Sequence, residues 1–514
     1  MLSKIHCYGL KGIEGFAVEV EVDISRGLPH FDVVGLADTA VKEAKERVHS
    51  AIKNSGYNYP LKRITVNLAP ADVKKEGPLY DLAIAIGIMA ADKDNDVPDF
   101  TSGKATPFVI LGELSLNGEV KPVKGLLPIL ISARSAGFKR FIIPSANALE
   151  ASYIQGLEIF AVSSLSEAVE FIAGHLQIQP LKALQFVPGQ AQEQGAMDFK
   201  FVKGQARAKR ALEIAAAGGH NVLMIGPPGS GKSMLAKCFP SILPDMTFEE
   251  ALEVTKIHSV AGELDFKKGI VSSRPFRTPH HSASAVSLTG GGTHSRPGEI
   301  SLAHNGVLYL DELPEYPRQC LEMLRQPLED GTITVARSAL TVTYPANFTL
   351  IASMNPCPCG NYGSKHKECK CSPSQIHKYL SKISGPILDR IDLHVEVDDV
   401  EFDDLRAERE EENSQSIKQR VDKARKIQLE RFRGMKNFSN AKMSVPATKR
   451  FCKLSQESEQ LLRTAFENLK LSARAHDRIL KVARTIADLE GEEEILPEHI
   501  AEAIAYRSLD RKYL

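Results

Sequence analysis

A glycine-rich turn, GPPGSGKS at positions 226–233, limits the folds open to this chain because of the patterns on either side of it. Positions 221–225 (NVLMI) have the pattern of a buried strand, and positions 234–239 (MLAKCF) have that of a helix. Between a strand and a helix, such a turn directs successive backbone N–H groups and the helix N-terminus at phosphate groups. The segment therefore predicts an α/β domain with a nucleoside triphosphate site at the turn.

A second pattern, VLYLDE at positions 307–312, is an apolar strand that ends in two carboxylates. We expect Lys232 at the β- and γ-phosphates and the Ser233 hydroxyl on Mg²⁺. Asp311 is expected to hold the same Mg²⁺, and Glu312 to orient or deprotonate the attacking water. Each pattern alone also fits a chance turn or a solvated strand end, but the two in this order favour ATP hydrolysis. The predicted nucleotide-binding residues are Gly226, Pro227, Pro228, Gly229, Ser230, Gly231, Lys232, Ser233 and Met234.

Length and charge bound the remaining possibilities. The 514 residues are enough for about three domains. The longest uncharged apolar run, at 82–91, is far shorter than the roughly 20 residues that cross a bilayer, so we expect a cytoplasmic protein with no membrane partner. The formal net charge is zero, so a DNA partner has to be argued from local basic patches.

The patterns along the chain predict four regions. Positions 1–175 predict a compact α/β domain, positions 176–198 an exposed Gln-, Gly- and Pro-rich linker, positions 199–400 the ATPase domain, and positions 401–514 a helical domain. In the first domain, strands are expected at 17–22, 64–68, 108–111 and 140–143, and helices at 39–55, 81–91, 127–136 and 164–173.

Longer runs carry a family resemblance. They are GQARAKRALEIAAAGGHN (204–221), RPFRTPHHSAS (274–284), RPGEISLAHNGVLYLDELPE (296–315), NPCPCG (355–360), SGPILDRIDLHVEV (384–397) and LSARAHDRILKVARTIADL (471–489). On these runs the chain resembles, nearly end to end, the magnesium-chelatase-like AAA+ ATPases of the YifB/ComM type. The resemblance implies a homo-hexameric ring that moves on single-stranded or branched DNA in recombination or natural transformation. The alternative is a chelatase-like or protein-remodelling ATPase with no nucleic-acid role.

The resemblance also implies roles for three residues of the ATPase and lid domains. Asn355 matches the polar sensor beside the γ-phosphate, and Arg390 matches the arginine finger that reaches the nucleotide of a neighbouring subunit. A salt bridge with Asp389 or Asp392 is the alternative for Arg390. Arg474 matches the second sensor on the helical lid, with a solvated helix face as its alternative. Two further arginines of the same helix remain rivals for that role: Arg478 and Arg484.

The first domain resembles the Lon protease domain, a serine-lysine peptidase fold in its active relatives. KEGPLYDLAIAIGI (75–88) matches the stretch that carries the nucleophile, and LGELSLNGEVKPVKGLLPILISARSAG (111–137) matches the stretch that carries the base. Leu79 and Leu127 occupy the two catalytic positions, and an isobutyl group can neither attack a carbonyl nor accept a proton. Lysines lie nearby, without a hydroxyl partner at the expected place: Lys74, Lys75 and Lys124. We expect an inactive scaffold for assembly or substrate contact.

Two basic segments are candidates for contact with DNA. The insertion at 258–304 predicts a mobile basic loop, with Arg274 and Arg277 as the candidate contacts. Its basic residues are Lys267, Lys268, Arg274, Arg277, His280, His281 and Arg296. Alternating residues at 332–335 and 340–343 predict a β-hairpin with Arg337 at its tip, and in related ring helicases such a hairpin projects into the central channel. Cationic rings of this kind would hold phosphates without reading sequence. Packing between subunits is the alternative.

The cysteines favour a metal site over disulfides. Cys357, Cys359, Cys369 and Cys371 give C-x-C twice across a hydrophilic loop, and four thiolates can close a tetrahedral zinc site. Free reduced thiols are the alternative, because the spacing is less usual than C-x₂-C. The other four cysteines are isolated and expected to be small buried apolar residues.

Overall fold

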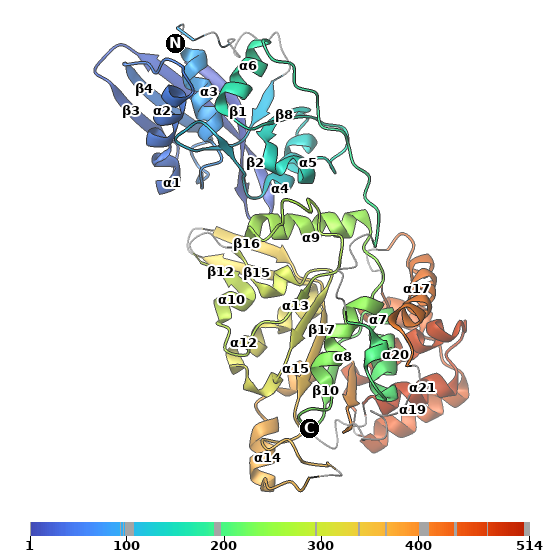
Figure 1. Ribbon diagram of the computed structural model, residues 1–514. Helices are drawn as coiled ribbons and strands as arrows, with labels where there is room; N and C mark the ends of the chain where they lie inside the picture. Colours follow the sequence, from blue (N-terminus) through green and yellow to red (C-terminus); the bar gives the residue numbers. More distant parts are fainter. Residues whose placement is uncertain are drawn as a thin grey trace. The chain divides into compact units, whose positions relative to one another are not determined.

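The computed structural model divides the chain into two compact units (Figure 1). It describes residues 2–92, 94–95, 97, 107–189, 197–292, 296–337, 340–364, 367–399, 411–435, 439–469 and 471–507, without the side chains of Arg337 and Leu340. Part of the predicted linker and the predicted boundary at 400/401 lie outside these ranges. None of the described helices is long and apolar enough to cross a membrane.

The first unit comprises Met1–Pro188 and, from much later in the chain, Phe248–Val271. Its seven-stranded sheet has the order β3-β4-β2-β1-β5-β8-β9. The strands and helices expected here are present, although the helix expected at 39–55 is divided into α1 and α2. The structure adds β1, β3, β9, α5 and the short strands β6 (Glu113–Leu114) and β7 (Val120–Lys121). The strands are β1 (Leu2–Lys11), β2 (Glu14–Ser25), β3 (His30–Val34), β4 (Arg63–Ala69), β5 (Phe108–Ile110), β8 (Arg140–Pro144) and β9 (Glu158–Val162). The helices include α1 (Thr39–Lys42), α2 (Ala44–Asn54), α3 (Asp81–Ala91), α4 (Leu126–Ser135), α5 (Ala148–Ala151), α6 (Leu165–Ala173) and α9 (Phe248–Ala261).

The core of this unit forms because α3 is apolar almost all round, which is the pattern of a helix buried on every side. It packs against β1, β2 and α2, and α4 covers β2. Helix α9 leaves the sequence of the ATPase domain to pack on α4. The Oγ of Ser259 in α9 accepts a hydrogen bond from the backbone N–H of Gly125 at 3.1 Å.

The second unit is built on a five-stranded parallel sheet of order β11-β14-β17-β10-β18. Its strands are β10 (Val222–Ile225), β11 (Phe276–Arg277), β14 (Val307–Leu310), β17 (Thr349–Met354) and β18 (Leu393–Glu396). The helices named below are α7 (Ala206–Gly218), α8 (Lys232–Cys238), α12 (Arg318–Met323), α13 (Arg325–Asp330), α14 (Pro373–Leu380), α17 (Ser414–Arg431), α18 (Val445–Phe451), α19 (Gln456–Leu469), α20 (Ala473–Glu490) and α21 (Pro497–Ala505).

The C-terminal region is helical, as expected, and shares a core with the parallel sheet. Helix α20 packs against α7, α17 and α21, and the buried residues of these helices form one cluster with those of β10 and β18. The predicted hairpin is confirmed as β15 (Thr332–Arg337) paired with β16 (Leu340–Pro345) in antiparallel register. It directly precedes β17.

The predicted mobile loop at 258–304 is wrong for its described residues. Part of the segment belongs to α9 in the first unit, and the rest folds into short elements of the second. These are β11, α10 (Ala285–Thr289), β12 (Gly290–Gly291), β13 (Arg296–Pro297) and α11 (Glu299–Leu302). The segment is ordered because it buries Leu288, Ile300 and Leu302. The prediction of a mobile loop considered its basic residues and left these apolar ones out.

Candidate nucleotide site

The candidate site lies where three parallel strands end. Strand β17 pairs in parallel with β10 on one side and with β14 on the other, so the carboxyl ends of the three strands meet at one edge of the sheet. The turn at 226–231 follows β10, Asp311 and Glu312 follow β14, and Asn355 follows β17. All residues of β10 and β14 are buried, which fixes these strand ends in place. The structure thus brings the two sequence patterns and Asn355 together.

Lys232 occupies the centre of the turn. Its ammonium group donates hydrogen bonds to the carbonyl oxygens of Gly226 at 2.7 Å and Pro227 at 2.8 Å, and lies 3.4 Å from Asn355 Oδ1. Burial lowers the pKa of Lys232 to about 8, against the opposing effect of nearby carboxylates. A phosphate group here would favour the charged form of the ammonium group, as the predicted role requires.

Ser233 and Asp311 form the predicted Mg²⁺ pair. The Ser233 hydroxyl donates to Asp311 Oδ2 at 2.9 Å, so a hydroxyl and a carboxylate oxygen already lie side by side. Burial raises the pKa of Asp311, but hydrogen bonds from Ser353, Ser233 and Tyr309 outweigh it and bring the pKa below its usual value. The charged carboxylate and the hydroxyl are hard oxygen ligands of the kind that Mg²⁺ prefers.

Two members of this network were missed by the sequence prediction. Ser353 donates to Asp311 Oδ1, and the Tyr309 hydroxyl lies 3.1 Å from Ser353 Oγ and 3.3 Å from Ser233 Oγ. Tyr309 lies in β14 and Ser353 in β17, and both strands have the apolar pattern of the core. A lone polar residue near the carboxyl end of each strand was the available signal.

Glu312 has an unusual backbone. Its φ is +53°, in the left-handed region that non-glycine residues rarely adopt, and such strain is found at functional sites. Its side chain is half exposed, and one carboxylate oxygen lies 3.4 Å from His281 Nδ1. Because β11 is the parallel neighbour of β14, the residues after β11 reach the same sheet edge. His281, which the sequence placed in a substrate loop, therefore lies beside the predicted water-activating carboxylate.

Arg390, the predicted arginine finger, lies at the opposite edge of the sheet. The backbone N–H groups of Asp392 and Leu393 donate to the Asn221 carbonyl, which places Arg390 at the amino ends of β10 and β18. Strand β10 alone separates this edge from the phosphate turn by about 13 Å. Arg390 pairs with Glu329 of α13, and not with Asp389 or Asp392.

Arg474 lies near the same carboxylate. Its guanidinium approaches Glu329 Oε1 at 4.0 Å, and its side chain is 58% exposed, whereas that of Arg390 is 4% exposed. The two rivals for its role have buried partners: Arg478 pairs with Asp392 and Arg484 with Asp488. Of the three arginines, Arg474 is therefore the one most accessible to a ligand.

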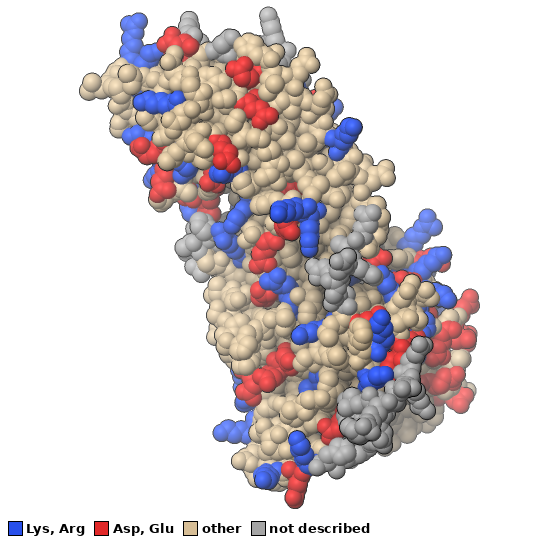
Figure 2. Space-filling model, in the orientation of Figure 1, with Lys and Arg blue, Asp and Glu red and all other residues tan. Residues whose placement is uncertain are grey.

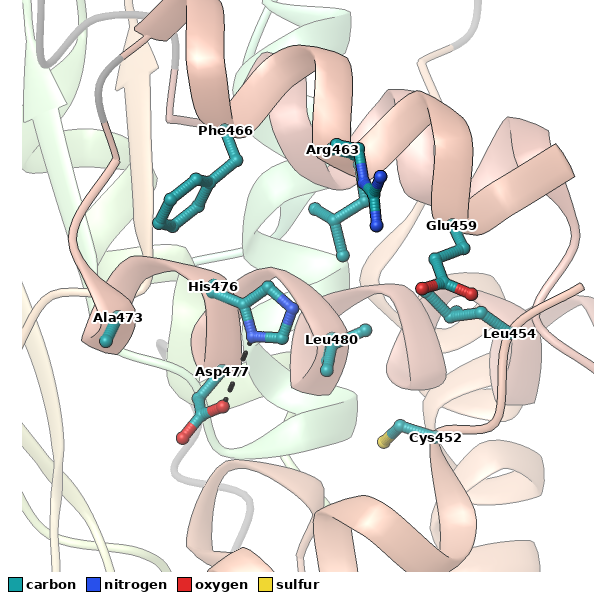
Figure 3. Close-up of a pocket in the computed structure, with 10 residues that line it drawn as sticks. Cys452, Leu454, Glu459, Arg463, Phe466, Ala473, His476, Asp477 and Leu480 are labelled. Carbon is teal, nitrogen blue, oxygen red and sulfur yellow. Dashed lines mark hydrogen bonds and ion pairs between the residues drawn. The ribbon is translucent and has the colours of Figure 1, made fainter. Parts of the chain in front are cut away.

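A separate hollow lies in the helical lid. Its volume is about 560 Å³, and it lies between α19, α20 and the segment after α18 (Figure 3). Its walls combine apolar side chains, such as Phe466 and Leu480, with Arg463 and the neighbouring pair His476 and Asp477. No residue of the predicted nucleotide site lines it.

The candidate DNA contacts have different surroundings. Arg274 donates to the carbonyl oxygens of Pro244 at 2.6 Å and Asn305 at 2.7 Å, and Arg277 forms a two-pronged ion pair with Glu299 at 2.6 and 2.8 Å. These contacts hold the fold together. Arg337 ends β15 at the tip of the hairpin, as predicted. Figure 2 shows basic and acidic side chains interspersed on the face it presents, so overall charge marks no DNA surface there.

The four cysteines converge. Their sulfur atoms all lie within 4.8 Å of one another, with Cys357 Sγ 3.4 Å from Cys359 Sγ and 3.7 Å from Cys369 Sγ. A tetrahedron with bonds of about 2.3 Å separates its sulfurs by roughly 3.8 Å. Hydrogen bonds from the backbone N–H groups of Asn361 and Lys370 lower the pKa of Cys359 to about 6, whereas at Cys369 and Cys371 a backbone hydrogen bond is outweighed by burial and the neighbouring thiols, which raise the pKa values. The cluster can hold a metal ion.

The peptidase positions of the first unit are part of its core. Leu79 is 8% exposed and Leu127 is 1% exposed, and both belong to one apolar cluster. Lys75 is buried, with its ammonium group donating to the Pro70 carbonyl, while Lys74 pairs with Glu76 on the surface. These residues hold no nucleophile and base pair.

Comparisons with known proteins match this architecture. The family described as "Magnesium chelatase, subunit ChlI" matches residues 198–405, "Subunit ChlI of Mg-chelatase" matches 20–147, and "Magnesium chelatase, subunit ChlI C-terminal" matches 411–507. "Competence protein ComM" of Haemophilus influenzae is 44% identical over 514 residues, covering 99% of this chain and 98% of that protein. "Uncharacterized protein YifB" of Escherichia coli is 43% identical over 511 residues, with the same coverage.

Two shorter matches concern ATPases. "DNA repair protein RadA" of Aquifex aeolicus is 36% identical over 109 residues, covering 21% of this chain and 22% of that protein. "Lon protease 2" of Bacillus subtilis is 26% identical over 180 residues, covering 32% and 31%. Together with the full-length relatives and with Lys232, Ser233 and Asp311 at one edge of the sheet, these matches identify the protein as an ATPase. The chain belongs to the magnesium-chelatase-like AAA+ ATPases of the YifB/ComM type.

Proposed function

We propose that the protein is a homo-hexameric, ATP-driven motor that moves on single-stranded or branched DNA. The observation that carries the proposal is the separation of the catalytic groups within one protomer. Lys232, Ser233 and Asp311 lie at the carboxyl edge of the parallel sheet, and Arg390 lies at the amino edge. A nucleotide that needs both sets must lie between two protomers, and a repeated interface of that kind closes into a ring.

Within this interface, each residue has a distinct task. Lys232 holds the β- and γ-phosphates, and Asn355, 3.4 Å from it, positions the γ-phosphate and the water. The strained backbone of Glu312 directs its carboxylate at that water, and the carboxylate accepts the proton that the water loses as it attacks the γ-phosphate. Bound Mg²⁺, held by Ser233 and Asp311, supplies charge neutralisation at the phosphates. Arg390 of the next protomer offsets the charge on the transferred phosphoryl group, and Arg474 serves as the second sensor on the helical lid.

The DNA part of the proposal rests on the hairpin. Strands β15 and β16 lead straight into β17, whose end carries Asn355, so a change at the γ-phosphate has a short covalent route to the hairpin. The relatives named for competence and DNA repair agree with this direction. The contrary candidate, a chelatase-like or protein-remodelling machine, is favoured by the descriptions of the three matching families.

The deciding experiment compares ATP turnover with different added substrates. We expect single-stranded or forked DNA to raise the turnover rate, and unfolded protein or porphyrin to leave it unchanged. Arg337→Ala should weaken DNA binding and make its salt dependence shallower by about one unit of slope per protomer engaged. Stimulation by unfolded protein or porphyrin alone, without DNA binding, would favour the contrary candidate.

We propose zinc as the metal of the cysteine cluster. The sulfur separations suit a tetrahedral ion, and four thiolates are a common structural zinc set in which the metal stabilises the fold. Metal analysis of the purified protein should give one zinc per chain, and replacing Cys369 by Ser should remove it. A metal-free protein with four titratable thiols would support the free-thiol alternative.

We also propose that the first unit is an inactive scaffold of Lon-protease type. The resemblance of residues 75–88 and 111–137 to the Lon protease domain and the apolar groups at both catalytic positions support it. Incubation with unfolded protein and ATP should produce no cleavage.

A further inference from the structure

The cysteine loop starts at the nucleotide site. Strand β17 ends at Met354, Asn355 lies 3.4 Å from the Lys232 ammonium group, and the first ligand candidate, Cys357, comes two residues later. Cys357 is completely buried, and its Sγ accepts the backbone N–H of Tyr362 at 3.3 Å. Asn355, which contacts Lys232, is therefore separated from the cysteine cluster by a single residue.

The same loop touches the phosphate turn a second time. Gly360, with φ of +79°, packs so closely on Pro228 that an added methyl group would lie 2.5 Å from its Cδ and 2.7 Å from its Cγ. Pro228 is one of the residues that shape the turn around the phosphates. The loop between Cys357 and Cys369 thus meets the turn through Asn355 on one side and through Gly360 on the other.

The described part of the loop buries few side chains, although Ser364 donates a hydrogen bond to Asp399 at 2.9 Å. Of its described residues from 358 to 370, only Gly360 is buried. A segment with so small an apolar core gains order from metal ligation, which the cysteine cluster would supply. When the loop is ordered, the Gly360 contact and Asn355 are both held against the phosphate turn.

We propose that metal at the cysteine cluster and nucleotide at the phosphate turn stabilise each other's binding, through the contacts of Gly360 with Pro228 and of Asn355 with Lys232. This inference rests on the proposed zinc site. Because coupling between two sites is reciprocal, nucleotide must strengthen metal binding by the same factor by which metal strengthens nucleotide binding. We expect at least a fivefold effect, the lower end of the usual range for coupled sites.

The test starts from the full-length, zinc-loaded protein. Zinc release to a chromogenic chelator is timed with and without a non-hydrolysable ATP analogue and excess Mg²⁺, and the affinity of a fluorescent nucleotide is measured with and without zinc. The analogue should slow release at least fivefold, and loss of zinc should weaken nucleotide binding by a similar factor. In Lys232→Ala, which cannot hold the phosphates, the analogue should leave the release rate unchanged.

Gly360→Ala tests the route. It should retain one zinc per chain and lose most of the coupling, because the added methyl group separates the loop from Pro228. Gly491→Ala is the matched control: Gly491 has φ of +80° with nothing within 4 Å, so the variant repeats the backbone strain without a clash and should keep the coupling.

The possible outcomes distinguish a failure of the coupling between metal and nucleotide from a failure of the zinc site on which it rests. A protein that contains no zinc overturns the zinc site. If the zinc-loaded protein releases zinc at the same rate with and without the ATP analogue, the coupling is overturned and the zinc site is retained. Full coupling in Gly360→Ala overturns the Pro228 contact as its route.

Discussion

Burial of the Lys232 ammonium group among backbone carbonyls makes nucleotide binding depend on pH. Its folded-state pKa is about 8, below the ordinary value of 10.5, because burial disfavours the charge. Above pH 8 the nucleotide-free protein therefore holds Lys232 increasingly deprotonated, while a chain unfolded at that pH would still carry the proton. The stability contribution of this group consequently rises between about pH 8 and 10.5.

The binding experiment that follows uses calorimetry of ADP in two buffers with different ionisation enthalpies. Phosphate contact restores the charge, so we expect ADP binding to take up a fraction of a proton at pH 8.5 and almost none at pH 6.5. A binding heat that is independent of the buffer at pH 8.5 would contradict the assignment of Lys232 to the phosphates.

The contact between His281 and Glu312 gives a second prediction at the residue scale. His281 Nδ1 lies 3.4 Å from the Glu312 carboxylate, and both side chains are partly exposed, so the contact is worth at most about 1 kcal/mol. We expect His281→Ala to lower kcat by up to about fivefold, with nucleotide affinity unchanged. Glu312→Gln should lower kcat by about a hundredfold or more, because it removes the proton acceptor.

His280→Ala is the matched control for His281. The His280 ring packs on that of His281 and bonds the Ser282 hydroxyl at 2.7 Å, with Glu312 outside that contact. In a coupled ATPase assay, His280→Ala should turn over ATP at the wild-type rate, and His281→Ala should turn it over more slowly. Equal losses in both variants would show that the aromatic stack matters and the carboxylate contact does not.

At the scale of elements, the location of helix α9 could not be predicted from the sequence. The helix is preceded and followed by segments of the ATPase unit, yet it packs on α4 of the first unit. Close to this contact lies Glu150, 1% exposed, which accepts hydrogen bonds from Asn147 and, at 3.4 Å, from the Ser259 hydroxyl of α9. Burial raises the pKa of Glu150 from 4.5 to about 7.

The raised pKa predicts how the docking of α9 responds to pH. Between pH 4.5 and 7 an unfolded Glu150 loses its proton before the folded one does, so its contribution to stability falls as the pH rises. Hydrogen-exchange protection of α9 and α5, corrected for intrinsic rates, should decrease from pH 5 to pH 8 in the wild type and stay level in Glu150→Gln. Glu119→Gln, at an exposed ion pair with Lys121, should follow the wild type.

At the scale of the whole molecule, the prediction concerns sharing of the nucleotide between protomers. Arg390→Ala should abolish turnover while sparing ATP binding, and Glu312→Gln should do the same. A mixture of the two variants should recover part of the activity, because some interfaces then combine an intact Arg390 with an intact Glu312. No recovery at any mixing ratio, with mixed assemblies verified by mass, would leave Arg390 as the buried partner of Glu329 and nothing more.

Dilution provides an independent check at the same scale. If the nucleotide is shared, turnover per protomer falls as the protein is diluted below the concentration at which it assembles. Full turnover by isolated protomers, confirmed as monomers by light scattering, would contradict the shared site.

Local patterns predicted much of the molecule. Patterns within about ten neighbouring residues predicted four features of the structure. These are the phosphate turn with Lys232, the carboxylates after β14, the hairpin β15–β16 and most elements of the first unit. A glycine-rich turn, a period-two alternation or an apolar run acts through backbone geometry that is local to it. For that reason these predictions needed no knowledge of the rest of the chain.

What the sequence alone determined is therefore which residues to place at one site: Lys232, Ser233, Asp311 and Glu312 at the strand ends, and the four cysteines that converge. Only the tertiary structure decided that Ser353 and Tyr309 tune Asp311, that His281 meets Glu312, that Glu329 holds Arg390 and that α9 belongs to the first unit. The physical reason is that these contacts join residues far apart in the chain. They exist because parallel strands bring their ends to a common edge and because buried faces must find partners, and neither event leaves a pattern in a short stretch of sequence.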